Sequence, residues 1–483
     1  MLLALALRLP MLSKSFIGDE ICTLEYARQP LPGLFSYVAA HDSHPPLYYL
    51  IIHFCRMLGT NEMWIRLPGV LLGVGTCYLI FLIASEFTSR RGALIAAVFA
   101  AISPRFVAIS QLARNYVLVT FLIALSTYLL IRIIRRPRLI LWVGYVLASA
   151  AALYSFYYAA YAIVAQGLAY AVAGRHSRRQ WLAWLAAQAG IVALFLPWVP
   201  WFLMQLSTVK SDPTGIDTAA FGGALARSVV WTIASVEPLA ELPTRLTAEP
   251  YVLAFAGLLG AGLIAGCVYA YRRRAARGWA IMATLLLAVL GQAVGMRIAL
   301  NGYIAPNYLA FASIFGCVLA GMAFGRARSI LVVGLTIAIC LVGLVRLPET
   351  YRPIDDWRGA GELLAKRVRP GEYVATLYNG AAECVDHYSM GKIKAHGLPD
   401  GVRGADPAPG RDLVCAVLPE HIGPIGREFA LHKTVWMVWY HTRRGSIDRG
   451  GSLVRDCLSR EGFSVVESHN FPSIEVERYV RAD

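Results

Sequence analysis

The sequence predicts a polytopic α-helical membrane protein of about eleven spans, the first of them truncated, followed by a small extracytoplasmic α/β domain. Hydrophobic residues make up 57% of the 483 residues, and the mean hydropathy is +0.54. Charged residues make up only 16%, whereas soluble domains have about 25%. Apolar runs of about 20 residues, long enough to cross a bilayer, recur as far as residue 346.

Ten complete apolar runs are expected to span the membrane. They lie near residues 67–86, 92–110, 116–134, 139–155, 157–173, 181–203, 251–271, 279–296, 306–324 and 330–346. The first run, residues 1–11, is too short to cross a bilayer, which takes about 20 residues. It also lacks the basic start and the small-residue cleavage site of a signal peptide. We therefore expect it to be the end of a first span, with the true start codon of the protein lying upstream.

Arginine-rich loops predict how the chain is oriented. Five alternate loops, at residues 90–91, 132–138, 175–179, 272–277 and 326–328, hold 15 arginines, and the only acid near them is Glu86. Loops of this kind remain in the cytoplasm. We therefore expect a multi-pass protein of the bacterial inner (cytoplasmic) membrane, with residues 12–66, 204–250 and 347–483 on its outer face. The basic excess belongs to these short loops, so nucleic acid is not an expected partner.

The expected transmembrane domain, residues 1–346, has two long outer loops, at 12–66 and 204–250. The first loop has no run long enough to span, because His53 and Arg56 interrupt residues 46–58. We expect helices near residues 20–28 and 46–58 to lie along the membrane surface.

The tail, residues 347–483, has balanced charge, with 18 basic and 19 acidic residues. Alternating patterns predict strands at 372–377, 413–418, 433–440 and 463–468. Amphipathic patterns predict helices at 355–368 and 452–461, and residues 397–410 are expected to form a loop. The tail is therefore expected to be a small α/β domain on the outer face.

Apart from Glu86, the acidic residues of the expected membrane domain lie in its outer segments. No Asp or Glu occurs between Phe87 and Ser211, or between Pro250 and Pro348. Transporters coupled to protons or sodium usually keep ionisable residues inside their spans. Carboxylate chemistry in this chain must therefore use the outer loops.

Three outer motifs follow one another at successive turns. The first is Gly18-Asp19-Glu20, directly after the first apolar run. The second is the run His41-Asp42-Ser43-His44-Pro45-Pro46-Leu47-Tyr48-Tyr49, which leads on to Arg66-Leu67-Pro68. The third is Ser110-Gln111-Leu112-Ala113-Arg114-Asn115-Tyr116. Each motif alone is a weak signal, but their order and their topological positions together are specific.

These motifs resemble those of the GT-C glycosyltransferases. The similar group contains the protein O-mannosyltransferases and the lipid A aminoarabinose transferase (glycosyltransferase family 39-like). The resemblance covers about residues 8–120, and Trp357-Arg358-Gly359 is similar to a pattern found after the last span of many members. The chain departs from the family at two positions. Leu112 stands where the family has Glu, and Asn307 stands where it has Arg.

The resemblance implies an inverting transfer of a sugar from a polyprenyl-phosphate donor to an acceptor hydroxyl on the outer face. A polyprenyl phosphate leaves without a strong acid, whereas the acceptor hydroxyl needs a general base, for which a carboxylate is suitable. Asp19 is expected to be that base, acting by direct displacement. Glu20 is expected to hold the acceptor or to tune Asp19.

Further residues are expected to bind the substrates. Since Asn307 replaces the family arginine, another cation must bind the donor phosphate, and arginine suits this contact. The candidates are Arg66, Arg114, Arg297 and Lys210, and the expected substrate-binding set also includes Asp42, His44, Tyr48, Tyr116 and Asn307.

For some of these residues a plainer interpretation stays open. His44 can equally be a histidine at the start of a helix, and Tyr48 fits an interfacial aromatic belt. Asp42 with His44 could also hold a divalent metal, although two ligands two residues apart are a weak metal signal. No metal or other cofactor is predicted with them.

Two other classes of function stay open at this point. One is a transporter or flippase for a lipid-linked glycan, although the expected spans have almost no polar interior. The other is a catalytically inactive binding homologue, which Leu112 and Asn307 make conceivable. The sequence names neither the sugar nor the acceptor, which can be a lipid, a glycan or a protein.

Overall fold

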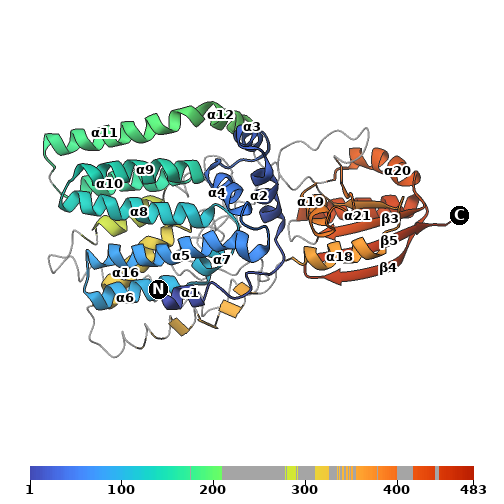
Figure 1. Cartoon of the computed structure of the whole chain (residues 1–483), viewed down its shortest axis with the longest axis horizontal. Coiled ribbons are helices and arrows are strands. Elements are labelled where there is room, and N and C mark those ends of the chain that lie inside the picture. The colour runs from blue at the N-terminus through green and yellow to red at the C-terminus, as the bar shows by residue number, and fades with distance from the viewer. Residues whose placement is uncertain are drawn as a thin grey trace.

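The computed structural model of the chain describes residues 1–174, 176–208, 280–289, 310–325, 355–377, 379–399, 417–440 and 445–482, with single positions between 278 and 351. These residues form a helical bundle that is joined at one end to a mixed α/β sheet (Figure 1). The predicted span at 251–271 and the outer loop beyond residue 208 lie outside the described residues.

The first outer segment folds into three helices after the short α1 (Leu2–Ala6). These are α2 (Gly18–Arg28), α3 (Leu31–His41) and α4 (Leu47–Arg56), so helices near 20–28 and 46–58 are confirmed. The sequence did not predict α3. Proline is compatible with the first turn of a helix, and Pro32 lies in the first turn of α3.

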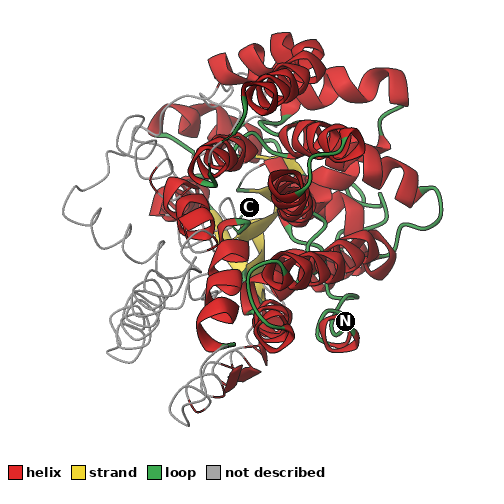
Figure 2. Cartoon of the chain, turned by 90° about the vertical axis from the view of Figure 1, so that its left-hand side faces the viewer, coloured by secondary structure: helices red, strands yellow, loops and turns green. Residues whose placement is uncertain are grey.

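The bundle itself is built from long apolar helices. Their bounds are α5 (Glu62–Ser85), α6 (Arg90–Ile102), α7 (Pro104–Ser110), α8 (Tyr116–Arg135), α9 (Leu139–Ser155), α10 (Ala159–Val172), α11 (Arg178–Phe195), α12 (Val199–Thr208) and α16 (Ala312–Phe324). A single 3-10 turn, Leu196–Trp198, joins α11 to α12. Figure 2 views this bundle with many helices end-on and the strands behind them.

Within the described part of the chain, three helices are long and apolar enough to cross a membrane: Glu62–Ser85, Tyr116–Arg135 and Arg178–Gln205. The pair α6 and α7 would add a fourth span, but it is bent by 58°. The expected span at 92–110 therefore corresponds to two helices with a sharp bend between them. Pro104 disfavours a helical Ser103, and the Ser103 side chain instead caps α7 by accepting from Phe106 N.

Apolar side chains also lie on the outside of the bundle. Only 22% of the most apolar window of Arg178–Gln205 is buried, and Leu182, Leu185 and Val192 are each more than half exposed. Outward-facing leucine and valine are expected where a helix meets lipid. The chain is thus a helical membrane protein, whereas the total of eleven spans stays a prediction.

Two glycines bring α5 and α7 together. A Cβ atom on Gly73 would lie 2.1 Å from Ser110 Oγ, and one on Gly69 would lie 2.8 Å from the Ser110 carbonyl oxygen. The spacing of four residues puts both glycines on one face of α5. The end of α7 therefore packs closely against α5, which positions the turn at residues 111–115.

The C-terminal part is a five-stranded sheet in the order β2-β1-β3-β5-β4. Its strands are β1 (Tyr373–Thr376), β2 (His396–Gly397), β3 (Thr434–Tyr440), β4 (Phe463–Phe471) and β5 (Ile474–Arg481). β2 and β3 both pair with β1 in parallel, and β5 pairs antiparallel with β3 and β4. The helices are α18 (Trp357–Arg367), α19 (Asn379–Tyr388), α20 (Ile422–Ala430) and α21 (Gly445–Arg460).

Most of the expected elements of this part are confirmed. The predicted strands at 372–377, 433–440 and 463–468 match β1, β3 and β4, and the predicted helices at 355–368 and 452–461 match α18 and α21. The sequence missed β5, α19 and α20, and it placed the short β2 at the edge of an expected loop. The predicted strand at 413–418 lies mostly outside the described residues, and its last two residues are not in a strand.

Candidate active site

Glu20 and Arg66 form an ion pair that is completely shielded from solvent. Arg66 Nε lies 2.8 Å from Glu20 Oε1, and Nη2 lies 2.6 Å from Oε2. The other N–H groups of Arg66 donate to the carbonyl oxygens of Leu12, Lys14 and Ser15 at 2.6–3.1 Å. Because arginine has five N–H donors, these contacts use all of them. Arg66 therefore has no donor left for a phosphate.

The Glu20 carboxylate is equally occupied. It accepts the backbone N–H of Ile17 at 3.1 Å and that of Ala113 at 2.7 Å. Glu20 thus links the start of α2, the start of α5 and the turn after α7. The structure gives Glu20 and Arg66 a positioning role in place of the expected substrate contacts, because both side chains are 0% exposed.

Asp19, the neighbour of Glu20, faces the other way. Its side chain is 49% exposed, and its Oδ2 lies 3.8 Å from Arg114 Nε. Arg114 Nη1 also donates to the Asp19 carbonyl oxygen at 3.3 Å and to Thr23 Oγ at 3.4 Å. The Thr23 hydroxyl itself donates to the Asp19 carbonyl oxygen at 3.0 Å. An accessible carboxylate therefore lies beside a buried guanidinium group, an arrangement suited to a base next to an anion.

Asp42 and His44 form a second polar group beside α4. Asp42 Oδ1 accepts from His44 Nδ1 at 2.8 Å and from the backbone N–H groups of Ser43 and His44 at 2.6 and 3.1 Å. Asp42 Oδ2 accepts the Tyr49 hydroxyl. From α12, Gln205 Nε2 donates to the Asp42 carbonyl oxygen at 2.7 Å. These bonds fix the orientation of the imidazole.

The charge of Asp42 is held by its neighbours. Burial raises the pKa of the Asp42 carboxyl, but the His44 ring, Arg114 and the Tyr49 hydroxyl outweigh burial and lower the pKa to about 2. Asp42 is therefore ionised at neutral pH. Because Arg114 acts electrostatically on both Asp42 and Asp19, the two acidic motifs meet at one arginine.

A metal ion held by Asp42 and His44, the alternative left open by the sequence, does not fit this geometry. His44 Nδ1 and Asp42 Oδ1 contact each other at 2.8 Å, so an ion between them would have to replace that hydrogen bond. Across the residues that the structure describes, no group of three or more His, Cys, Asp or Glu side chains is arranged to hold a metal ion.

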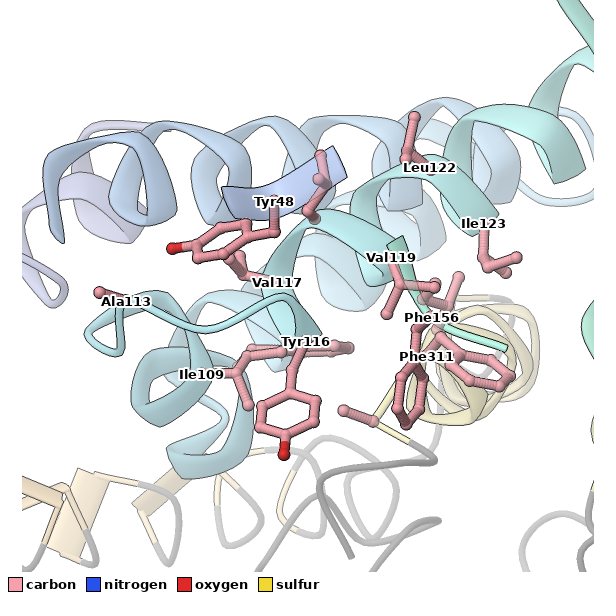
Figure 3. Close-up of a cluster of buried hydrophobic side chains, with 14 of the residues drawn as sticks. Tyr48, Ile109, Ala113, Tyr116, Val117, Val119, Leu122, Ile123, Phe156 and Phe311 are labelled. Atoms are coloured by element: carbon pink, nitrogen blue, oxygen red, sulfur yellow. The ribbon is translucent and has the colours of Figure 1, made fainter. Parts of the chain in front are cut away.

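Tyr48 and Tyr116 lie in the apolar core. Tyr48 is 0% exposed and Tyr116 is 6% exposed. Figure 3 shows both rings among buried side chains such as Val117 and Ile109. Little of either ring is accessible in this structure, and the expected substrate-binding role of both tyrosines stays a prediction.

Phe156 connects the two polar groups through aromatic contacts. It stacks on His44 with ring centroids 5.5 Å apart, and it meets Tyr116 edge-on at 5.9 Å. The Arg114 guanidinium in turn lies 5.9 Å from the centroid of the Tyr116 ring. A row of packed rings therefore runs from His44 to Arg114.

Sequence reasoning missed several members of this site. Phe156 sits at the break between α9 and α10, and Gln205 sits near the end of the expected span 181–203, where a lone glutamine is an uncertain signal. Tyr49 was named only as part of the second motif, and Thr23 was given no role. Only the polar Gln205 offered a sequence signal. Arg297, Asn307 and Lys210 lie outside the described residues.

The α/β part grips the same region from its other side. Arg358 of α18 pairs with Glu62 at the start of α5 and donates to the Ser13 carbonyl oxygen at 2.9 Å. The Tyr388 hydroxyl of α19 donates to Glu62 at 3.0 Å and accepts the Phe16 N–H at 2.6 Å. The segment that leads into Asp19 is thus held by α5 and by the α/β part.

Comparisons with known proteins give a match to one protein family over part of the chain. The family model for dolichyl-phosphate-mannose-protein mannosyltransferases matches residues 43–201. An uncharacterized protein from Aquifex aeolicus (strain VF5) is 27% identical over 143 residues, which is 29% of this chain and 29% of that protein. The sequence match thus spans less than a third of the relative.

Solved structures of similar fold cover almost the whole chain. The fold resembles ArnT from Cupriavidus metallidurans in its apo state, with a TM-score of 0.61, 14% identity, and coverage of 99% of this chain and 96% of that chain. For the same protein bound to undecaprenyl phosphate, the TM-score is 0.60 and the sequence identity 14%, with coverage of 98% of this chain and 96% of that chain. The fold also resembles the archaeal oligosaccharyltransferase AglB from Archaeoglobus fulgidus, solved in complex with an inhibitory peptide and a dolichol-phosphate. The TM-score is 0.55 and the sequence identity 14%, with coverage of 90% of this chain and 68% of that chain. At these identities the likeness is one of fold.

Proposed function

We propose that this chain, a GT-C superfamily member by its fold and its family match, transfers a sugar from a polyprenyl-phosphate donor to an acceptor hydroxyl with inversion. The observation that carries the proposal is the difference in solvent exposure between two adjacent acids. Glu20 is enclosed and fully bonded, whereas Asp19 is 49% exposed beside Arg114. A base must reach its substrate, and only Asp19 of this pair can do so.

In the proposed reaction the Asp19 carboxylate accepts the proton of the acceptor hydroxyl as its oxygen attacks the anomeric carbon. The bond between that carbon and the phosphate oxygen breaks at the same time, and the polyprenyl phosphate leaves with the electron pair. The single displacement inverts the anomeric configuration. A positioned general base of this kind contributes roughly 10²–10⁴-fold to the rate.

Arg114 is the proposed partner of the donor phosphate. Arg66 is excluded because its five N–H groups are bonded inside the protein. Among the described residues, Arg114 donates from Nη1 to the Asp19 carbonyl oxygen and to Thr23 Oγ, and its Nε has no hydrogen-bond partner. A guanidinium group between base and phosphate would also stabilise the negative charge that builds up on the leaving oxygen. Arg297, Lys210 and Asn307 stay further proposals for the same donor.

After Arg114, His44 is the second proposed substrate contact, and it would bind either the donor or the acceptor. Asp42 accepts from its Nδ1, so the ring would present Nε2 to a substrate, in the manner of a carboxylate-oriented histidine. The side chain of His44 is 10% exposed, which leaves one edge of the ring accessible.

We further propose that the site lies on the outer face of the cytoplasmic membrane. The transmembrane domain would comprise residues 1–346, and the α/β domain, residues 347–483, would be extracytoplasmic. The bound lipids of the similar structures support a lipid-linked donor, since ArnT was solved with undecaprenyl phosphate and AglB with a dolichol-phosphate.

The proposal is tested with purified protein in lipid nanodiscs and a panel of labelled short-chain polyprenyl-phosphate sugars. We expect one of these donors to lose its sugar to an envelope extract, and the new glycosidic bond to have the inverted configuration by NMR. Translocation of the intact donor across the membrane of reconstituted vesicles is measured in parallel, in order to distinguish a transferase from a flippase. Translocation of the intact donor without any transfer would contradict the proposal.

A further inference from the structure

The α/β part has a reversal of strand order at its β1 and β3 strands. From β1 the chain passes through α19 to β2 on one side, and it later returns to β3 on the other side of β1. The three strands are parallel, so their carboxyl ends lie at one edge. In open α/β sheets, ligands bind outside the carboxyl ends of the strands at such a reversal.

This edge of the sheet faces the site around Asp19. Figure 1 shows α19, which follows β1, next to α2, while the C-terminus lies at the far end of the sheet. Cys22 Sγ lies 3.5 Å from Glu383 Oε2 of α19. Cys22 is three residues after Asp19, a spacing that puts both on one face of α2. Glu383 therefore contacts the helix that carries Asp19, across the junction.

A buried carboxylate completes the edge. Tyr440, the last residue of β3, donates its hydroxyl to Asp355 Oδ2 at 3.1 Å. Asp355 is 1% exposed, and among the described residues its Oδ1 has no hydrogen-bond partner. Burial and, as a smaller contribution, the Asp19 charge raise the pKa of Asp355 to about 6, although side-chain hydrogen bonds act in the opposite direction. The two carboxyl groups are thus within electrostatic reach of each other.

We propose that this edge of the α/β part is the acceptor site, in which Glu383 and Tyr440 bind a hydroxyl-rich carbohydrate acceptor and direct one of its hydroxyls to Asp19. This inference rests on the proposed glycosyl transfer. Ionised carboxylates only accept hydrogen bonds, and the Tyr440 hydroxyl, whose hydrogen goes to Asp355, can take part in any further hydrogen bond only as an acceptor. Several adjacent acceptors fit a sugar with neighbouring hydroxyls better than the single hydroxyl of a serine or threonine side chain.

The test uses the full-length protein in nanodiscs, a labelled polyprenyl-phosphate sugar, and an envelope extract separated into glycolipid, free glycan and protein fractions. Glu383→Gln and Tyr440→Phe are the test variants. Glu372→Gln and Tyr479→Phe are matched controls, because both residues are bonded within the sheet away from the junction, Glu372 to Trp436 and Tyr479 to Glu477. Each variant is titrated with both the donor and the labelled fraction, and donor hydrolysis without acceptor is also measured.

We expect the labelled sugar to appear in the glycolipid fraction or in the free glycan fraction. The labelled fraction then shows whether the acceptor is a glycolipid or a free glycan. The acceptor concentration at half-saturation should rise about tenfold or more in Glu383→Gln and about two- to tenfold in Tyr440→Phe. Donor half-saturation and donor hydrolysis should match the wild type, as should both control variants.

Two results would overturn the acceptor site while leaving the proposed transfer intact. One is label that enters only the protein fraction. The other is acceptor half-saturation in Glu383→Gln and Tyr440→Phe equal to that of the controls. Wild-type protein that neither transfers nor hydrolyses any donor would instead refute the proposed function, and the acceptor site with it.

Discussion

Glu20 and Arg66 form a buried pair at the end of the bundle that meets the α/β part, and Arg66 donates every one of its N–H groups to protein oxygen atoms. The adjacent Asp19 remains 49% exposed, because successive residues of a helix point about 100° apart. Two neighbouring acids are thus separated into a positioning residue and an accessible one.

Glu20→Gln is expected to destabilise the protein. Removing one partner of a buried ion pair leaves an uncompensated charge and costs about 3–5 kcal/mol. The measurement is the free energy of unfolding of the purified protein in detergent. Glu25→Gln, which breaks the partly exposed pair with Arg28, is the control and should change it by less than about 1 kcal/mol. Equal stability of Glu20→Gln and wild type would contradict the assignment.

Arg114→Ala is expected to weaken donor binding more than folding. Loss of a charged hydrogen bond to phosphate costs about 1.5–3 kcal/mol, so the donor KM should rise roughly 10- to 150-fold. Donor titrations of the variant and of Arg28→Ala, an exposed cation at the other end of α2, provide the comparison. An unchanged donor KM would transfer the phosphate role to Arg297 or Lys210.

The stability of the protein should depend on pH through Asp355. Burial raises the pKa of this carboxyl to about 6 in the folded state, above the unfolded value of about 3.9. Between these values the native state binds more protons than the unfolded chain, so stability falls as pH rises from about 4 to 6. The loss should reach about 2–3 kcal/mol at neutral pH.

Asp355→Asn should remove this dependence, since it cannot titrate. Thermal unfolding scans at pH 4, 6 and 7.5 check the prediction. The variant should gain stability over the wild type at pH 7.5 and show little gain at pH 4. Parallel curves for the two proteins across this range would show that Asp355 titrates normally.

The arginine-rich loops predict the side of the membrane on which the α/β part lies. A reporter that is active only in the cytoplasm, fused after Asp483, should therefore remain silent. The same reporter fused within the loop at residues 132–138 is the positive control. Strong activity from the C-terminal fusion would put Asp19 on the cytoplasmic side and contradict the proposed topology.

The sequence predicted much of the fold because hydropathy and charge are local signals. Apolar runs mark the long helices, and the alternation in 433–440 marks β3. The bend at Ser103 was missed because residues 92–110 are apolar on both sides of it. β5 was missed because charged residues alternate along it, and Arg478 and Glu477 find partners only in the folded sheet.

The site was predicted less completely, because tertiary contacts decide the roles of its residues. The motifs drew attention to Asp19, Glu20, Arg66 and Arg114, but only the fold shows which of them are enclosed. Arg66 and Arg114 look alike in the sequence. One is saturated by three carbonyl oxygens and a carboxylate, whereas the other lies beside an exposed acid.

Single-turnover transfer by Asp19→Asn tests the central claim most directly. The variant keeps the size of the side chain but cannot accept a proton at neutral pH, so its rate should fall roughly 10²–10⁴-fold. It should insert into the membrane at the wild-type level and bind the donor, since Arg114 remains. With equal amounts of purified protein and saturating donor, we expect bound donor and almost no product. Transfer at close to the wild-type rate would contradict the account, because another group would then be the base.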